Sequence, residues 1–251
     1  MISVCLSTYN GEKFILEQIE SILTQLTSSD ELIISDDGST DNSLSIIQSV
    51  HDNRIVLIHN SGPHGVNNNF ENAIRHAKGD YIFLSDQDDV WLPNKVECCV
   101  DALKQVDLIV HDCKVVNAEL GIIYPSYFHQ FNSRKGYLKN IIRNTYIGAC
   151  MAFRKEVLDY ILPFPCKFPV YHDGWIASMV ELMGNVEFLD VPCILYRRHD
   201  SNMSFSAVKS GIPYHKKLVN RILWFYLTYK RYLTIKFKTI IICQYLKVKP
   251  S

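Results

Sequence analysis

The sequence predicts an α/β fold with a mostly parallel, doubly wound sheet, flanking helices and a basic helical tail. Over residues 1–112, short apolar runs alternate strictly with helical patterns, an order typical of parallel sheets because each crossover supplies a helix. None of the 26 acidic residues follows Asp200, whereas ten of the 26 Lys and Arg residues do. The first 200 residues therefore carry a formal charge of −10, and residues 201–251 carry +10.

Each predicted element of the first half has its own pattern. Strands are expected at 2–7, 31–35, 54–59, 80–85 and 107–112, where the runs are apolar. Apolar residues at helical spacing follow the first and third strands, from Ile15 to Leu26 and from Phe70 to Ala77. Further helices are expected from about Asp41 and from Pro93, which suits a first helical position.

The pattern loosens after residue 112. An apolar run at 144–153 and strand candidates at 186–190 and 193–197 precede a break near Asp200. Residues 207–249 are expected to form helices with mixed faces. We therefore expect a domain over 1–204, with halves 1–112 and 113–204, and a tail over 205–251.

Polar clusters follow three of the predicted strands, at 7–10, 36–41 and 85–89. Ligands of open parallel sheets bind beyond the carboxyl ends of the strands, so these tips are expected to form one pocket.

Three carboxylates crowd the fourth strand end, at Asp86, Asp88 and Asp89. Such groups repel one another unless they are protonated, hydrogen-bonded or neutralised by a cation. Mg²⁺ or Mn²⁺ would satisfy them, because both prefer oxygen ligands and complete their shells with water and phosphate. The alternative is that Asp88 or Asp89 only caps the helix near Pro93.

The run from Asp36 to Ser39 suits recognition of a base or a sugar. A carboxylate can accept a hydrogen bond from an imide N–H, and Gly38 permits a sharp turn. An ordinary turn and helix cap would explain the same residues.

Six segments together resemble the inverting glycosyltransferases of family 2. They are STYNG (7–11), SDDGSTD (35–41), GVNNNFENA (65–73), KGDYIFLSDQDDVWLPNK (78–95), HDGW (172–175) and YRRHDSNMS (196–204). The version with Gln in the acidic motif is similar to bacterial rhamnosyltransferases and other polysaccharide-assembly enzymes. The resemblance spans about residues 2–204 and implies the Rossmann-like fold of nucleotide-diphospho-sugar transferases, with a nucleotide-binding half (1–112) and an acceptor-binding half (113–204).

The resemblance also implies site residues. Thr8, Tyr9 and Asp37 would line the base pocket, Asp86 would lie near the ribose and the metal, and Asp88 would ligate Mg²⁺ or Mn²⁺.

Other roles fall in the second half of the chain. Asp173 would be the general base, although it could simply cap its helix. His199 would be a third metal ligand or a phosphate contact, or an exposed histidine without a role, and Arg198 would clamp the diphosphate. Gly148 would allow close approach of a sugar.

The implied reaction is metal-dependent transfer of a sugar from a nucleotide-diphosphate donor to a glycan hydroxyl. Rhamnose on thymidine diphosphate is the first expectation for the donor, and a uridine diphosphate sugar is the alternative. Nucleotidyl transfer would also use paired aspartates, but the sequence lacks a Gly-rich basic phosphate loop. A non-catalytic module that binds nucleic acid through the tail is a third interpretation.

The basic, aromatic tail favours a membrane surface as partner over nucleic acid if the protein is such an enzyme, because acceptors of this kind are commonly lipid-linked. The tail could instead pack on the acidic first domain. No basic segment precedes the first strand, no apolar run reaches ~18 residues, and the eight cysteines form no CxxC pair. We therefore expect a cytoplasmic protein, peripheral at the inner face of the membrane.

Overall fold

The computed structural model describes residues 1–166, 169, 171–199 and 213–245. A nine-stranded sheet has the order β3-β2-β1-β4-β8-β6-β9-β5, and β7 pairs with β6. The strands are β1 (Ile2–Thr8), β2 (Glu31–Asp36), β3 (Ile55–His59), β4 (Tyr81–Asp86), β5 (Val90–Trp91), β6 (Leu108–Val116), β7 (Ile122–Tyr124), β8 (Met151–Arg154) and β9 (Val186–Arg197). The α-helices are α1 (Ile15–Leu23), α2 (Ser43–Ser49), α3 (Val66–His76), α4 (Lys95–Leu103), α5 (Tyr127–Phe131), α6 (Tyr137–Ile142), α7 (Leu158–Ile161), α8 (His172–Met183) and α9 (Tyr214–Tyr245).

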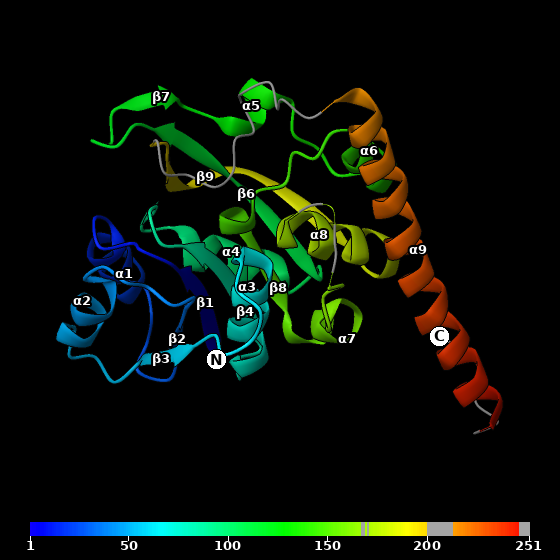
Figure 1. Cartoon of the computed structure of the whole chain (residues 1–251), viewed down its shortest axis with the longest axis horizontal. Coiled ribbons are helices and arrows are strands. Elements are labelled where there is room, and N and C mark those ends of the chain that lie inside the picture. Colours follow the sequence, from blue (N-terminus) through cyan, green and yellow to red (C-terminus); the bar gives the residue numbers. More distant parts are fainter. Residues whose placement is uncertain (167–168, 170, 200–212, 246–251) are drawn as a thin grey trace.

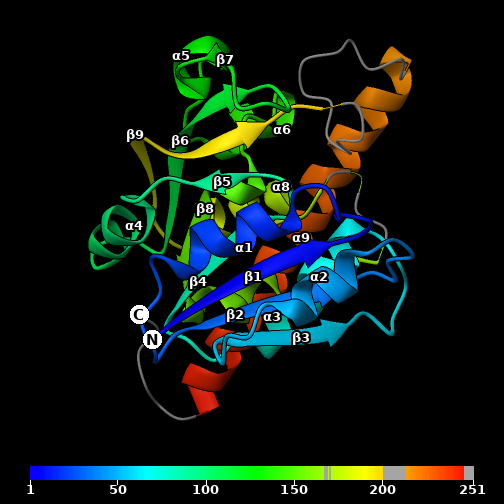
Figure 2. The ribbon, with the colours of Figure 1, turned by 90° about the vertical axis from the view of Figure 1, so that its left-hand side faces the viewer.

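The first half of the sheet confirms the predicted parallel arrangement. Strands β3, β2, β1 and β4 pair in parallel, each with its neighbour. All of β2 is buried, as is β1 apart from Ser7, which explains their nearly continuous apolar sequences. Figure 1 shows α1 and α2 on one side of these strands and α3 on the other, and α1 lies between β1 and β5 in Figure 2.

The second half makes the sheet mixed. Strand β8 runs antiparallel between β4 and β6, β9 runs parallel to β6, and β5 closes the edge antiparallel to β9. The two strand candidates at 186–190 and 193–197 are one strand, β9, whose register shifts where Asp112 faces Pro192. Such an irregularity accommodates proline, which has no N–H to donate to the ladder. The expected strand at 144–153 is β8 preceded by a short 3₁₀ turn at Gly148–Cys150.

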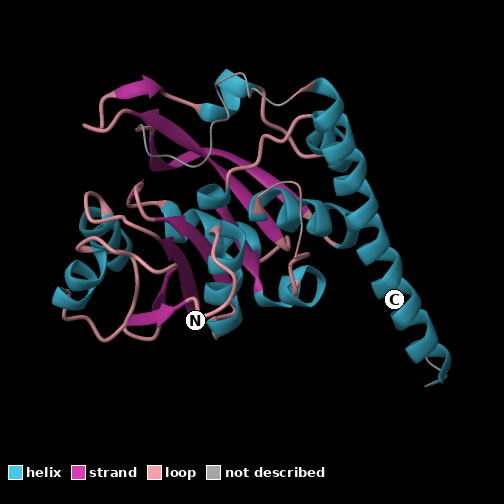
Figure 3. Cartoon of the chain, in the orientation of Figure 1, coloured by secondary structure: helices cyan, strands magenta, loops and turns pink. Residues whose placement is uncertain are grey.

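The predicted helical tail is present as the 32-residue helix α9, while the break near Asp200 lies outside the described residues. Helix α9 stands at one edge of the molecule, and its C-terminal part reaches beyond the sheet (Figures 1 and 3). Within the described ranges, no helix combines the length and the hydrophobicity needed to cross a membrane.

One face of α9 packs on the second half of the domain. The Trp224 indole is buried and donates to the Ser178 hydroxyl at 2.9 Å. The Thr228 and Tyr137 hydroxyls lie 2.7 Å apart, and Arg231 donates to backbone carbonyls at the end of α7. The described part of the tail therefore packs on the first domain, as the alternative expected, and its hydrogen-bond partners on α6, α7 and α8 are hydroxyl and backbone carbonyl groups.

Candidate active site

The carboxyl ends of β1, β2 and β4 meet at one cavity of about 980 Å³. Register places them together, because Ser7 pairs with Asp86 and Thr8 pairs with Asp36. The predicted site residues that line the cavity are Tyr9, Asp37, Asp86, Asp88, Gly148, Asp173 and His199. Aromatic residues from the second half, including Tyr127, Tyr146 and Tyr171, line it as well. A single cavity thus joins residues that are up to 192 positions apart in sequence, from Ser7 to His199.

Asp86 and Asp88 carry closely spaced negative charge at the end of β4. Burial, together with the neighbouring carboxylates of Asp88 and Asp173, raises the pKa of Asp86 to about 7. Asp88 Oδ2 lies 2.8 Å from His199 Nε2, which brings together two of the predicted metal ligands. A divalent cation would favour the ionised form of all these carboxyl groups.

These residues fit Mg²⁺ or Mn²⁺ at a site where the protein supplies only some of the ligands and a bound diphosphate would supply others. Among the described residues, no group of three or more His, Cys, Asp and Glu side chains is arranged to hold a metal by itself. Asp88 and His199 would supply two ligands, and Asp86 would supply nearby charge. Both ions commonly take the rest of their shells from water and from substrate phosphates, so a partial protein shell suits a diphosphate-bound cation.

Asp89 serves a structural purpose instead. It is fully buried, and its Oδ1 accepts the backbone N–H of Arg197 at 3.0 Å. Burial, with the charges of Asp88 and Asp86, raises its pKa well above the usual range. Helix α4 has Asn94 at its N-cap and no side-chain cap hydrogen bond. The alternative of Asp88 or Asp89 as a helix cap is therefore wrong for this helix.

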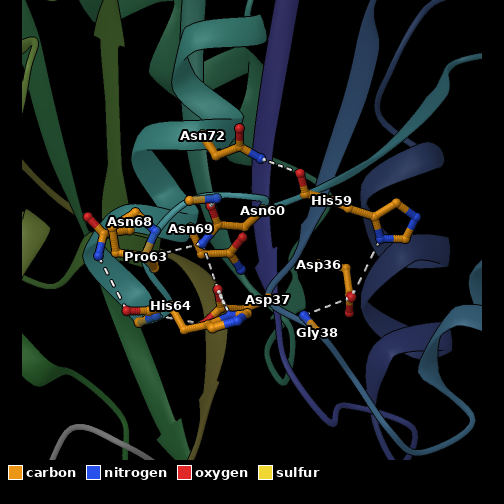
Figure 4. A network of polar contacts seen from close by, with 12 residues as sticks. Asp36, Asp37, Gly38, His59, Asn60, Pro63, His64, Asn68, Asn69 and Asn72 are labelled. Carbon is orange, nitrogen blue, oxygen red and sulfur yellow. Dashed lines mark hydrogen bonds and ion pairs between the residues drawn. The ribbon is translucent and has the colours of Figure 1, made fainter.

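Asp37 has three hydrogen-bond partners, Asn60, His64 and Gly65, and Figure 4 shows Asn60 and His64 beside it. Its Oδ1 accepts from Asn60 Nδ2 at 2.7 Å and faces His64 Nδ1 at 3.2 Å, while Oδ2 accepts from Gly65 N at 2.7 Å. Each carboxylate oxygen has about two lone pairs, so acceptor capacity remains toward the cavity. The network orients Asp37 and leaves His64 mostly exposed beside it.

Tyr9 and Thr8 differ in their exposure to the cavity. Tyr9 is 54% exposed and lines it. Thr8 is buried outside the lining, and its hydroxyl donates to Gln87 Oε1 at 2.7 Å. The same oxygen accepts the backbone N–H of Tyr9 at 2.8 Å. Gln87, which our sequence analysis left without a role, thus joins the end of β1 to the acidic motif.

Asn69 of α3 was also overlooked, although it lies in one of the quoted motifs. Its Nδ2 donates to Ser7 Oγ at 2.8 Å and to the Ser35 carbonyl at 2.8 Å. Ser35 Oγ donates back to Asn69 Oδ1 at 2.6 Å. This buried amide ties the ends of β1 and β2 together in the wall of the cavity.

Asp173 lies in the first turn of α8 and lines the cavity from the second half of the chain. Burial raises its pKa to about 7, although the Gly174 N–H, 2.6 Å from Oδ1, opposes the shift. The alternative role as a helix cap is wrong, because Tyr171 is the N-cap of α8 and no side-chain cap hydrogen bond is present, while Asp173 lines the cavity. A carboxyl group with this pKa changes charge near neutral pH, as a general base should.

His172 beside it is a packed, neutral ring. It stacks on Phe70 with centroids 3.9 Å apart, and burial lowers its pKa to about 3. A Cβ on Gly148 would lie only 2.3 Å from His172 Nε2. Gly148 is therefore required by the histidine ring, and it also lines the cavity, so close approach of a sugar stays a prediction.

Arg197 at the end of β9 holds the acidic loop in place. It is 2% exposed, its Nε donates to the Asp88 carbonyl at 2.7 Å, and its Nη1 donates to the Ala118 carbonyl at 2.6 Å. Its Nη2 pairs with Glu17. Arg198, the expected diphosphate clamp, lies over the Tyr196 ring at 4.9 Å and is not part of the cavity lining.

We expect Arg197→Lys to lower the free energy of unfolding by about 2–3 kcal/mol, because an ammonium cannot reproduce the buried fork of donors. Nucleotide binding should weaken with it, since the Asp88 backbone loses its donor. Thermal melting and calorimetric titration would measure both effects. Arg198→Lys is the matched control and should change neither by more than about 0.5 kcal/mol; equal losses in the two variants would contradict the assignment.

Asp86 makes the stability of the protein depend on pH. The folded protein keeps this proton to about pH 7, while an unfolded Asp loses it near pH 4. Stability therefore falls as pH rises through this window. We expect Asp86→Asn to raise the melting temperature by several degrees at about pH 8 and by roughly a third as much at about pH 5, where only the lower part of this window has been crossed.

Asp52 is a control for that measurement, because its pKa is shifted in the opposite direction. Its hydrogen bonds with Arg54 lower its pKa to about 2, so it is ionised at both pH values. Asp52→Asn should lower the melting temperature equally at both. A pH-independent effect of Asp86→Asn would show that its carboxyl is not the source.

Comparison with known proteins supplies the last observation. The family model described as Glycosyl transferase family 2 matches residues 3–162. The chain is 26% identical over 218 residues to the UDP-Glc:alpha-D-GlcNAc-diphosphoundecaprenol beta-1,3-glucosyltransferase WfgD of Escherichia coli, covering 83% of this chain and 81% of that one. It is 26% identical over 245 residues to the dTDP-rhamnosyl transferase RfbG of Shigella flexneri, covering 88% and 80%.

Among solved structures, S. aureus TarS 1–349 in complex with UDP-GlcNAc aligns with a TM-score of 0.65 at 19% identity, over 90% of this chain and 72% of that one. A second structure of S. aureus TarS 1–349 aligns with a TM-score of 0.64 at 21% identity over 60% of its length, so this chain spans less than two thirds of it. At such identity the likeness concerns the fold.

Proposed function

Because the chain belongs to glycosyltransferase family 2, and is therefore a glycosyltransferase, we propose that it moves a sugar from a nucleotide-diphosphate donor to a hydroxyl of a bacterial surface polysaccharide. The transfer inverts the anomeric centre, with Asp173 as general base and Mg²⁺ or Mn²⁺ as cofactor. The observation that carries this proposal is the cavity itself, which gathers Asp37, the acidic end of β4 and Asp173.

The donor would lie along the ends of the parallel strands. Tyr9 and Asp37 line the part of the cavity reached by β1 and β2, and the oriented Asp37 carboxylate suits the imide N–H of uracil or thymine. Asp88 and His199 would hold the cation against the diphosphate, where its charge would stabilise the leaving group. Asp86 would lie between the base pocket at Asp37 and this cation.

Asp173 faces the same cavity from α8, beside the aromatic lining that would receive the acceptor. The acceptor hydroxyl would pass its proton to the Asp173 carboxylate while its oxygen forms a bond to the anomeric carbon. The bond from that carbon to the diphosphate oxygen would break with its electron pair on the oxygen. A single displacement from the opposite face inverts the configuration.

The similarity to RfbG supports thymidine-diphospho-rhamnose as the donor, and the similarity to WfgD supports a uridine-diphospho sugar as the alternative. WfgD also supports a lipid-linked acceptor. Such an acceptor would present its sugar at a membrane surface, and the basic tail is the part of the chain that would meet that surface.

A transfer assay tests the proposal. The protein would be incubated with each nucleotide sugar, a polyprenyl-diphosphate glycan and Mn²⁺, and the released nucleotide would be identified. Glycosyl transfer releases the nucleoside diphosphate and yields the inverted anomer by NMR. Release of inorganic pyrophosphate would instead indicate nucleotidyl transfer, and turnover unchanged by a chelator would refute the metal requirement.

A further inference from the structure

The outward face of α9 carries a continuous apolar stripe. Its members follow the spacing i, i+4, i+7, i+11, i+15 and i+18, which a helical period places on one side. They are Ile222, Tyr226, Tyr229, Leu233, Phe237 and Ile240. Ile222 and Phe237 are 61% and 60% exposed, although they belong to an ordered helix. A groove of about 500 Å³ follows this stripe, lined by α9 residues alone.

The opposite face of the same helix is already used. Trp224, Thr228 and Arg231, spaced i, i+4 and i+7, hold α9 against the domain. The apolar stripe is therefore not the face through which α9 packs on the domain. It is a second apolar face that the described part of the chain leaves exposed.

Positive charge flanks the stripe. Between residues 214 and 245 the helix contains seven Lys and Arg residues and no Asp or Glu. Helical projection places Lys216 and Lys230 on one flank of the stripe and Lys236 on the other. Lys230 also lines the groove, with Nζ 5.7 Å from the Tyr226 ring centroid. Aromatic rings beside cations are typical of helices that lie in a lipid interface.

We infer that this face of α9 docks the protein on an anionic membrane surface, with the stripe turned toward the acyl chains and the lysines toward the headgroups. Charge complementarity selects this occupant. A second copy of the chain would bring seven cations against seven and no anions, which disfavours self-association. An anionic bilayer satisfies the cations and the apolar stripe together.

Docking in this way would orient the active site, and this consequence rests on the proposed function. The Trp224 indole is fixed to Ser178 of α8, and the first turn of α8 carries Asp173. The membrane-facing helix and the proposed base therefore belong to one packed unit. A lipid-linked acceptor would meet Asp173 at a set height and angle relative to the bilayer.

Vesicle flotation with the full chain tests the inference. We expect binding to vesicles of phosphatidylcholine and phosphatidylglycerol in equal parts, and much weaker binding to phosphatidylcholine alone. Ile222→Asp with Phe237→Asp should weaken binding at least about tenfold by removing inserted apolar area. Lys230→Gln should weaken it about fivefold, the equivalent of ~1 kcal/mol for one surface cation.

Ile122→Asp is the matched control, since Ile122 of β7 is 62% exposed, as Ile222 is 61% exposed; it should bind vesicles like the unmodified chain. Nucleoside diphosphate binding without vesicles should be unchanged in every α9 variant, so failure of the proposed function would appear separately. Equal vesicle binding by the Ile222→Asp, Phe237→Asp double variant and by Ile122→Asp would overturn the inference. It would also be overturned if the unmodified chain did not bind vesicles and instead formed a dimer, and if Ile222→Asp dissociated that dimer.

Discussion

Replacing Asp173 by Asn is expected to lower kcat by about 10²–10⁴-fold, the usual contribution of a general base. The amide keeps the size of the side chain but cannot take the proton of the acceptor hydroxyl. Donor affinity should stay within about twofold, because Asp173 would face the acceptor. Steady-state kinetics, with calorimetric titration of the nucleoside diphosphate, would separate the two quantities.

The pH profile provides a second readout for Asp173. Its pKa of about 7 means that the activity of the unmodified enzyme should rise as pH increases through neutrality and then level off. The residual activity of Asp173→Asn should lack that rise. The variant should also melt no lower than the unmodified protein near neutral pH, because it removes a carboxyl whose ionisation burial disfavours. A tenfold or smaller loss of kcat with the same pH profile would rule out the base.

Asp88→Asn is expected to abolish the contribution of Mn²⁺ to nucleotide binding. Loss of a carboxylate ligand should weaken nucleoside diphosphate affinity about 100-fold or more with Mn²⁺ present, and hardly at all in a chelator. Calorimetric titration under both conditions would measure the difference. His199→Gln should show a smaller loss of the same kind, because its Nε2 would be a single neutral ligand next to Asp88.

Asp101→Asn is the control for Asp88→Asn, as its carboxylate is exposed on α4 and pairs only with Lys104 among the described residues. It should leave both affinities unchanged. If the unmodified chain bound the nucleotide equally with Mn²⁺ and with chelator, the assignment of Asp88 and His199 to a cation would be wrong. The reaction would then need another group to offset the charge of the leaving diphosphate.

The site residues of the first half could be placed together from the sequence, because the order of its strands and helices follows from short-range patterns. Alternation of strand and helix orders the first strands in parallel, and parallel strands end at one edge. Tyr9, Asp37 and Asp86 could therefore be expected at one cavity before any coordinates. Asp173 and His199 came only through resemblance to a family, because the loosened pattern after residue 112 contains no period that would locate them.

By itself, the sequence determined the parallel half of the sheet, the acidic strand end and the opposite charges of domain and tail, since these follow from periodicity and composition within short windows. Only the tertiary structure decided that Asp89 serves Arg197, 108 positions away, that Gly148 makes room for His172, and that α9 turns Trp224 inward and Ile222 outward. Both faces of α9 carry apolar residues at helical spacing, with Trp224, Leu227 and Ile235 on the packed face, so the pattern alone could not tell which one packs. That choice depends on the shapes of α6, α7 and α8, which exist only once the distant strands have paired.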